Sequence, residues 1–180
     1  MVQKAGSISH QIRLSFLRIY KEENLMIIKE YKTELDRDKK NILCEICHYQ
    51  VEEDKLNNPK KIADFAMKQL HLDRCAEEYV YVLGFISSMK VLGIFEISHG
   101  TVSAAMCNPR EIFIRLLLVG ASCFVLIHNH PSGEPRPSRE DYMITEKLKK
   151  VGDLLGITLQ DSIIIGDQCY LSMKEDTEAI

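Results

Sequence analysis

The sequence lacks the features that would direct it to nucleic acid, to secretion or to a membrane. Its 23 basic residues are outnumbered by 26 acidic ones, for a net charge of −3 at pH 7, so there is no general attraction to nucleic acid. The start has neither the continuous apolar stretch nor the cleavage site of a secretory signal. The most apolar run, Leu116–Ile127, has only 12 residues and cannot span a bilayer. We therefore expect a cytoplasmic protein whose six cysteines are reduced thiols.

The N-terminal third of the chain gives the weakest structural signal. Residues 8–33 mix apolar and charged positions and fit a strand or a helix equally well. Residues 34–58 have charged ends around a short apolar centre, which predicts a variable connection. Internal repeats and low-complexity segments are absent from the sequence. We therefore divide the 180 residues into a variable segment, 1–57, and one folded domain, 58–180.

Helix-start residues mark three helices in the second part. The starts are Asn58-Pro59, Asn108-Pro109 with Glu111 as a capping-box glutamate, and Ser138. Gly120 and Gly156 are expected to end the second and third helices.

Apolar runs between these helices predict the strands. Residues 79–101 read as two strands around a Ser87-Ser88 turn, 122–128 as a buried strand, and 162–173 as a hairpin around Gly166-Asp167. Paired strands with covering helices predict an α+β fold, in which helices flank a central mixed sheet.

Two histidines stand one residue apart at the end of the buried strand. On a strand, His128 and His130 point to the same side, about 6.6 Å apart, and can converge on one zinc ion, whereas Asn129 must face the other way. Zinc held by two histidines often takes a carboxylate as third ligand and keeps a position for water. Asp141 can reach back across the stiff, proline-rich loop 131–137.

Two patterns have competing explanations. Ser138 and Asp141 also form a capping pair for the helix that follows, and one carboxylate can serve both purposes. Cys44, Cys47 and His48 have the spacing of haem attachment, or of half a second zinc site completed by His71 or Cys75. For this isolated cysteine pair, we favour chance, with both thiols partly buried.

The stretch HNHPSGEPRPSRED resembles the metal-binding signature of the JAMM/MPN metallopeptidase superfamily, which His128, His130, Ser138 and Asp141 match position by position. Residues 108–152 resemble its RadC-like branch more narrowly, and HGT at 99–101 and IIIGD near the C-terminus also fit. The resemblance covers about Asn58 to Met173. In one departure, the branch often has Asp-His where this chain has Asp161-Ser162.

The resemblance implies a JAB/MPN (cytidine-deaminase-like) architecture over residues 58–180. It also implies a zinc-dependent metallopeptidase that cleaves an amide or isopeptide bond of an unidentified peptide or protein. His128, His130 and Asp141 would hold Zn²⁺, and Ser138 would hydrogen-bond the oxyanion. The general base would be a glutamate at the start of an earlier strand. Glu78 matches that position best, and the alternatives are Glu77, Glu96 and Glu111.

A second function from another class is a non-catalytic or accessory RadC-like module in DNA repair or mobile-element DNA metabolism, with a structural metal site. A basic face at Lys147, Lys149 and Lys150 would favour it, although a solvated helix surface explains these lysines equally well. The ligand set and the candidate base favour catalysis, because a structural zinc site is normally closed by a fourth protein ligand.

Overall fold

A computed structural model describes residues 25–100, 108–177 and 179–180. Within them, seven strands form one mixed sheet in the order β2-β1-β4-β3-β5-β6-β7. The strands are β1 (Met26–Leu35), β2 (Asn41–Val51), β3 (Glu78–Phe85), β4 (Val91–Gly100), β5 (Cys123–Asn129), β6 (Thr158–Ile165) and β7 (Tyr170–Ser172). Neighbouring strands are antiparallel except for the parallel pairs β1–β4 and β5–β6.

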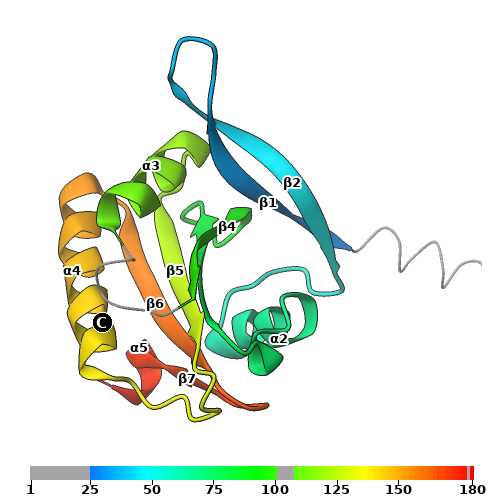
Figure 1. Ribbon diagram of the computed structural model, residues 1–180, viewed down its shortest axis with the longest axis vertical. Coiled ribbons are helices and arrows are strands. Elements are labelled where there is room, and N and C mark those ends of the chain that lie inside the picture. The colour runs from blue at the N-terminus through cyan, green and yellow to red at the C-terminus, as the bar shows by residue number, and fades with distance from the viewer. Residues whose placement is uncertain (1–24, 101–107, 178) are drawn as a thin grey trace, which may run out of the picture.

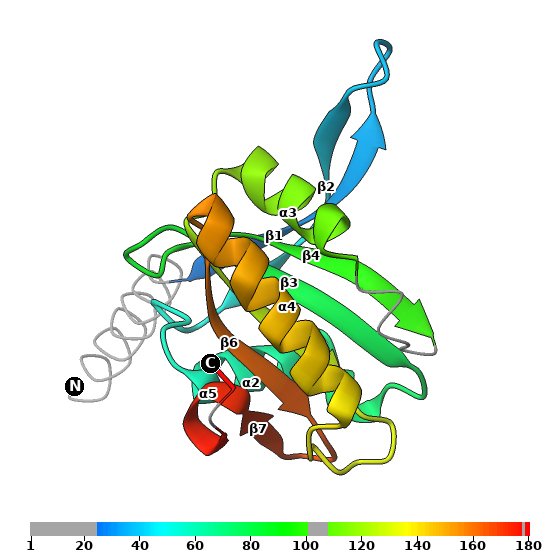
Figure 2. The same cartoon turned by 90° about the vertical axis from the view of Figure 1, so that its left-hand side faces the viewer.

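Helices cover both faces of this sheet. They are α2 (Pro59–Gln69), the 3-10 helix η1 (Leu72–Arg74), α3 (Pro109–Val119), α4 (Arg139–Leu155) and the short α5 (Met173–Asp176). Figure 1 shows α3 and α4 on one side of the sheet and α2 on the other, and Figure 2 shows α4 running across its face. The predicted α+β fold with a central mixed sheet is confirmed.

The sheet separates two apolar cores. On one face, Tyr81, Leu83 and Val125 join a cluster that includes residues of α2. On the other face, Val82 and Leu126 join a cluster that includes residues of α3 and α4. All seven residues of β5 are buried, because helices cover both of its faces. The strand that ends at the histidines is therefore rigidly held.

The predicted helix boundaries are confirmed. The Asn58 side chain accepts a hydrogen bond from the Lys61 N–H (2.9 Å) at the start of α2, and Asn108 caps α3 through the Arg110 N–H. Gly120 and Gly156 end α3 and α4 in the left-handed conformation. The Glu111 carboxylate forms ion pairs with Arg110 and Arg115.

The prediction of a connection over residues 34–58 was wrong. Residues 41–51 form β2, which pairs with β1 as an antiparallel hairpin at the sheet edge. The charged residues that suggested a connection form its turn, where the Asp36 carboxylate accepts the N–H groups of Asp38 (2.8 Å) and Lys40 (2.9 Å). Because most of β2 is exposed, it lacks the apolar pattern of a half-buried strand. Of the undecided segment, residues 26–33 are strand and 8–24 lie outside the described residues.

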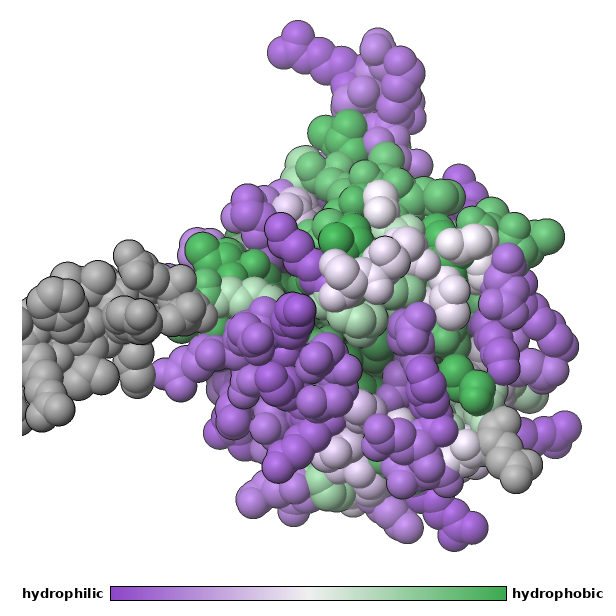
Figure 3. Space-filling view, turned by 180° about the vertical axis from the view of Figure 1, so that it is seen from behind, coloured by the Kyte–Doolittle hydropathy of each residue, from purple (hydrophilic) through white to green (hydrophobic). Residues whose placement is uncertain are grey.

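The hairpin projects beyond the rest of the sheet in Figures 1 and 2. Seen from behind, apolar side chains gather below its hydrophilic tip (Figure 3). In the described ranges, no helix is both long and apolar enough to cross a membrane.

Candidate metal centre

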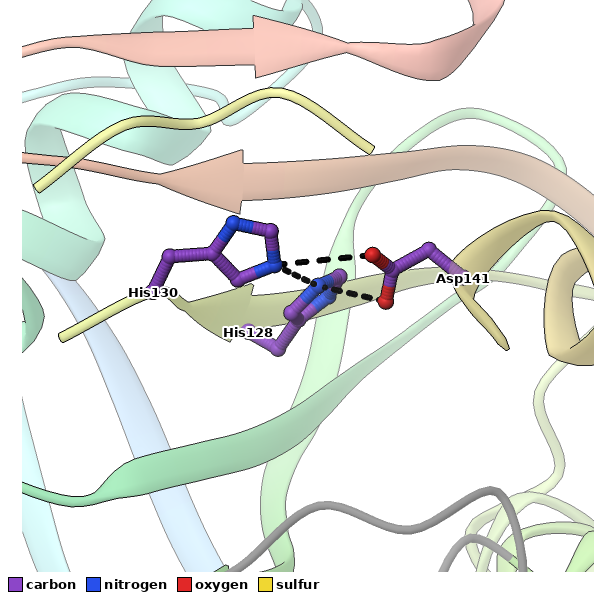
Figure 4. A group of neighbouring side chains, drawn as sticks. All are labelled: His128, His130 and Asp141. Atoms are coloured by element: carbon purple, nitrogen blue, oxygen red, sulfur yellow. Dashed lines mark hydrogen bonds and ion pairs between the residues drawn. The ribbon is translucent and has the colours of Figure 1, made fainter. Parts of the chain in front are cut away.

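The end of β5 holds both histidines on one side of the sheet. His128 lies between Val80 of β3 and Ile164 of β6. His130 follows the strand, but its N–H still donates to the Ile165 carbonyl (2.9 Å). The two Nε2 atoms are 3.2 Å apart, as the alternation of a strand predicts (Figure 4).

Asp141, in the first turn of α4, completes the group. Its Oδ1 lies 3.0 Å from His128 Nε2 and its Oδ2 lies 3.5 Å from His130 Nε2. One ligand atom from each residue lies within 4.8 Å of the others. Among the residues that the structure describes, this is the only His/Cys/Asp/Glu group with such geometry. The three predicted ligands are therefore brought together.

Ser138 and Asp141 also form a full capping box. The Ser138 hydroxyl oxygen accepts the Asp141 N–H (3.2 Å), and Asp141 Oδ2 accepts the Ser138 N–H (2.7 Å) and hydroxyl (2.6 Å). The competing explanation for this pair is thus correct as well, and the cap orients the carboxylate toward the histidines.

The hydrogen bonds of His130 test whether this group fits a cation. Its Nδ1 lies 2.9 Å from the Glu134 carbonyl oxygen, which can only accept, so Nδ1 carries the proton. In the neutral ring, Nε2 then presents a lone pair to Asp141 and His128. A backbone carbonyl on the second nitrogen is typical of metal-bound histidine. Because potential ligand atoms of His128, His130 and Asp141 converge, with His130 Nε2 free to accept, the group fits a divalent metal ion.

Charge and burial act together at this group. Burial alone would raise the pKa of Asp141, but the two adjacent imidazoles, in their protonated forms, and the Ser138 hydroxyl hold it well below its usual value. The Asp141 carboxylate raises the pKa of His130 against the effect of burial, and the negative charge of Glu78 adds to that rise. The carboxylate is therefore ionised and available as a ligand.

Comparison with known families agrees with this geometry. The sequence model of the RadC-like JAB domain family matches residues 56–178, which include all three ligand candidates. The chain belongs to this family. The match begins after β2, so the hairpin lies outside the part of the RadC-like JAB domain that the family model covers.

Curated relatives extend the comparison. The chain is 38% identical over 122 residues to a UPF0758 protein of Clostridium acetobutylicum, covering 68% of this chain and 52% of that protein. It is 34% identical over 125 residues to a UPF0758 protein of Thermotoga maritima, covering 69% and 55% respectively. The chain thus spans about half the length of these relatives, whose names state no reaction.

A short loop scaffold holds His130 in this RadC-like JAB domain. The Gly133 N–H donates to the His130 carbonyl (2.9 Å), and the Asp167 N–H donates to the Gly133 carbonyl (2.9 Å). The loop thereby rests on the β6–β7 turn, where a Cβ added to Gly166 would meet the Gly133 carbonyl oxygen at 2.4 Å. The sequence did not indicate this support, because Gly133 and the turn at Gly166 and Asp167 are more than 30 positions apart.

The four glutamates considered as general base lie in different surroundings. Glu78 begins β3 and shares a face with Val80, which pairs with His128. Glu77 precedes the strand. Glu96 bonds to His99 and Tyr81 on the opposite face, and Glu111 pairs with arginines. Glu78 is therefore the candidate that shares a face of the sheet with His128 and whose charge acts on His130.

The Cys44-x-x-Cys47-His48 pattern shows no metal geometry. It lies on β2, where Cys44 is half-buried but Cys47 is exposed, so the expectation that both are partly buried was wrong for Cys47. The thiols of Cys44 and Cys47 donate to the carboxylates of Glu34 (3.3 Å) and Glu30 (3.2 Å). The bond to Glu34 raises the pKa of Cys44, and burial raises that of Cys47. Both effects disfavour the thiolate that binds metal.

The departure from the family pattern at Asp161-Ser162 lies inside the sheet. Asp161 is buried and accepts hydrogen bonds from the Ser172 hydroxyl (2.7 Å), the Ser162 N–H (2.7 Å) and the Lys174 N–H (3.1 Å). It therefore ties β6 to the start of α5. The buried Ser162 hydroxyl has no hydrogen-bond partner among the described residues.

Proposed function

We propose that this RadC-like JAB domain is a zinc-dependent metallohydrolase, a metallopeptidase that cleaves an amide or isopeptide bond. The observation that carries the proposal is the convergence of His128, His130 and Asp141, with His130 Nδ1 bound to a carbonyl oxygen. Two imidazoles and a carboxylate favour zinc over harder cations, and three protein ligands leave a position for water, as in catalytic zinc sites.

Residues around the ligands supply the remaining chemistry. When bound, zinc lowers the pKa of a coordinated water to about 7. Glu78 accepts the proton of the attacking water and passes it to the leaving amine. The Ser138 hydroxyl stabilises the oxyanion. Because that hydroxyl donates to Asp141 Oδ2 in the structure (2.6 Å), it must rotate away from the carboxylate to do so.

The proposed substrate is a peptide or protein, and the proposed location is the cytoplasm. The five cysteines among the described residues are all unpaired, which suits a reducing compartment. DNA as a partner has less support. Lys150 pairs with Glu146 (2.7 Å) on α4. Together with Lys149 and Asp153, these two residues line a groove of about 410 Å³. This mixed charge is a solvated surface rather than a basic face.

Metal content tests the first half of the proposal. Elemental mass spectrometry of purified protein should find about one zinc per chain, lost in His130→Ala and kept in Cys44→Ser, because only the former removes a ligand. Zinc that is lost in Cys44→Ser and kept in His130→Ala, or no metal after reconstitution, would refute the proposed centre.

Turnover tests the second half. A screen of peptide and isopeptide-linked substrates should reveal cleavage that Glu78→Gln abolishes while its zinc content stays normal, because the substitution removes a base and leaves the ligands. Full zinc without cleavage of any substrate would favour the accessory module in DNA repair or mobile-element metabolism.

A further inference from the structure

Asn129 lies between the two histidines but faces away from them. It is 1% exposed, and both ends of its side-chain amide are used. Nδ2 donates to the Glu77 carbonyl (3.0 Å), and Oδ1 accepts the Tyr79 N–H (2.8 Å). One amide therefore binds the two peptide groups that flank Glu78.

This contact lies where the pairing of β3 with β5 stops. The β3–β5 register runs from Phe85–Cys123 to Val80–His128, and Glu78 is two residues beyond its last pair. On this edge of β3, the Asn129 side chain thus takes the place of a β5 partner for Glu77 and Tyr79. The other edge of β3 stays paired with β4 as far as Glu78–Gly100. Because side chains alternate along a strand, the Glu78 carboxylate is presented on the face of Val80 and His128 while its backbone is held from the opposite face.

We propose that Asn129 is a positioning residue that fixes the Glu78 carboxylate beside the metal centre. The inference rests on the proposed function, in which Glu78 is the general base. A base must lie within about 2.6–3.2 Å of the proton that it accepts, and a shift of about 1 Å in a reacting group is costly. The start of a strand is more prone to such shifts when it is paired along one edge only, and without the Asn129 amide β4 alone would hold this part of β3.

A zinc-binding probe can report the position of Glu78 without a known substrate. Acetohydroxamic acid binds zinc through two oxygens and offers a proton to a neighbouring carboxylate. We expect Glu78→Gln and Asn129→Ala each to weaken its binding to the zinc-loaded full chain on the order of tenfold. In the double variant, Asn129→Ala should cause no further loss, because its effect passes through Glu78. Calorimetric titration measures all four affinities.

Three controls separate positioning from general damage. Zinc content should remain that of the wild type in every variant, because no ligand is changed. Asn58→Ala removes the cap of α2 on the opposite face and should destabilise the protein without changing probe affinity. Asn129→Asp keeps the side-chain volume and the acceptor for Tyr79 but loses the donor to Glu77. It should weaken probe binding, and it serves as the test if Asn129→Ala does not fold.

The outcomes distinguish this inference from the proposed function. If Asn129→Ala lowers probe affinity equally in the wild type and in Glu78→Gln, the positioning role is overturned and the proposed function stands. Wild-type probe affinity in both Asn129 variants would have the same meaning. Wild-type affinity in Glu78→Gln itself, or the absence of zinc, would overturn the base or the metal centre, and the inference with it.

Discussion

Ser138 has two structural roles that one substitution can separate. Its oxygen caps α4 and its hydroxyl hydrogen binds the Asp141 carboxylate. Ser138→Ala should lower the free energy of unfolding of the metal-free protein by about 1 kcal/mol, the usual contribution of a helix cap. It should also weaken zinc binding about 10–100-fold, because the ligand loses the partner that orients it. Urea unfolding and chelator competition measure the two effects.

Asn58→Ala is the matched control for Ser138→Ala. It removes another side-chain cap, that of α2, and should cost similar stability while zinc affinity stays unchanged. If Ser138→Ala also leaves zinc affinity unchanged, the carboxylate does not depend on Ser138 for its orientation.

Asp161 makes the free energy of unfolding fall as pH rises. Burial raises its pKa against the hydrogen bonds from Ser172, Lys174 and Ser162. The folded state therefore holds the proton more tightly than the unfolded state, and the stability contributed at low pH is lost as pH rises from about 3.8 through the folded pKa. Asp161→Asn should remove this loss, because an amide needs no proton to remain neutral. Across that window, urea unfolding should show that the free energy of unfolding of Asp161→Asn, minus that of the wild type, increases as pH rises. A difference that stays constant with pH would contradict a raised pKa of Asp161.

The metal centre depends on a turn that contains no ligand. Gly166 packs against the loop that holds His130, where an added Cβ would meet the Gly133 carbonyl oxygen at 2.4 Å. Gly166→Ala should displace this loop, and with it the Glu134 carbonyl bound to His130. We expect zinc affinity to fall about tenfold or more, as when other supports of a ligand are lost, and chelator competition measures it.

Gly152 provides an equally crowded control. Its added Cβ would meet the Ile157 carbonyl oxygen at 2.3 Å near the far end of α4. Gly152→Ala should therefore destabilise the fold while zinc affinity remains unchanged in the protein that folds. Equal losses of affinity in both variants would mean that general destabilisation, rather than the loop, controls the centre.

Elements with strong local boundary residues were predictable. Asn58-Pro59 and Asn108-Pro109 each supply a cap and a fixed first turn, and these signals need no tertiary context. The β1–β2 hairpin was missed because backbone pairing between the two strands holds it together, although its alternation of apolar and polar residues is weak. Residue Ile28 is buried, but most of β2 is exposed, so period-two alternation is too faint to identify the strand from sequence.

The metal ligands were predictable from the sequence, whereas the residues that support them were not. His128 and His130 are two residues apart on a strand, and Asp141 opens the next helix, so local geometry predicted the group. The contacts of Asn129 with the start of β3 cross 50 residues, and those of Gly133 with Asp167 join a loop to a distant turn. Such contacts depend on strand order, which spacing along the chain does not reveal.

The hairpin lies outside the family match yet shares the sheet and the core. β1 pairs with β4, and Ile28 and Val51 are buried in the cluster that includes residues of α2. A chain that begins at Leu56 would lose these residues and leave β4 as an exposed edge. Because unprotected edges pair with other chains, we expect residues 56–180 to self-associate and to unfold at lower urea concentration than the full chain. Sedimentation velocity and urea unfolding measure both effects. A monomeric fragment with full stability would show that the hairpin is an independent appendage on a self-sufficient JAB domain.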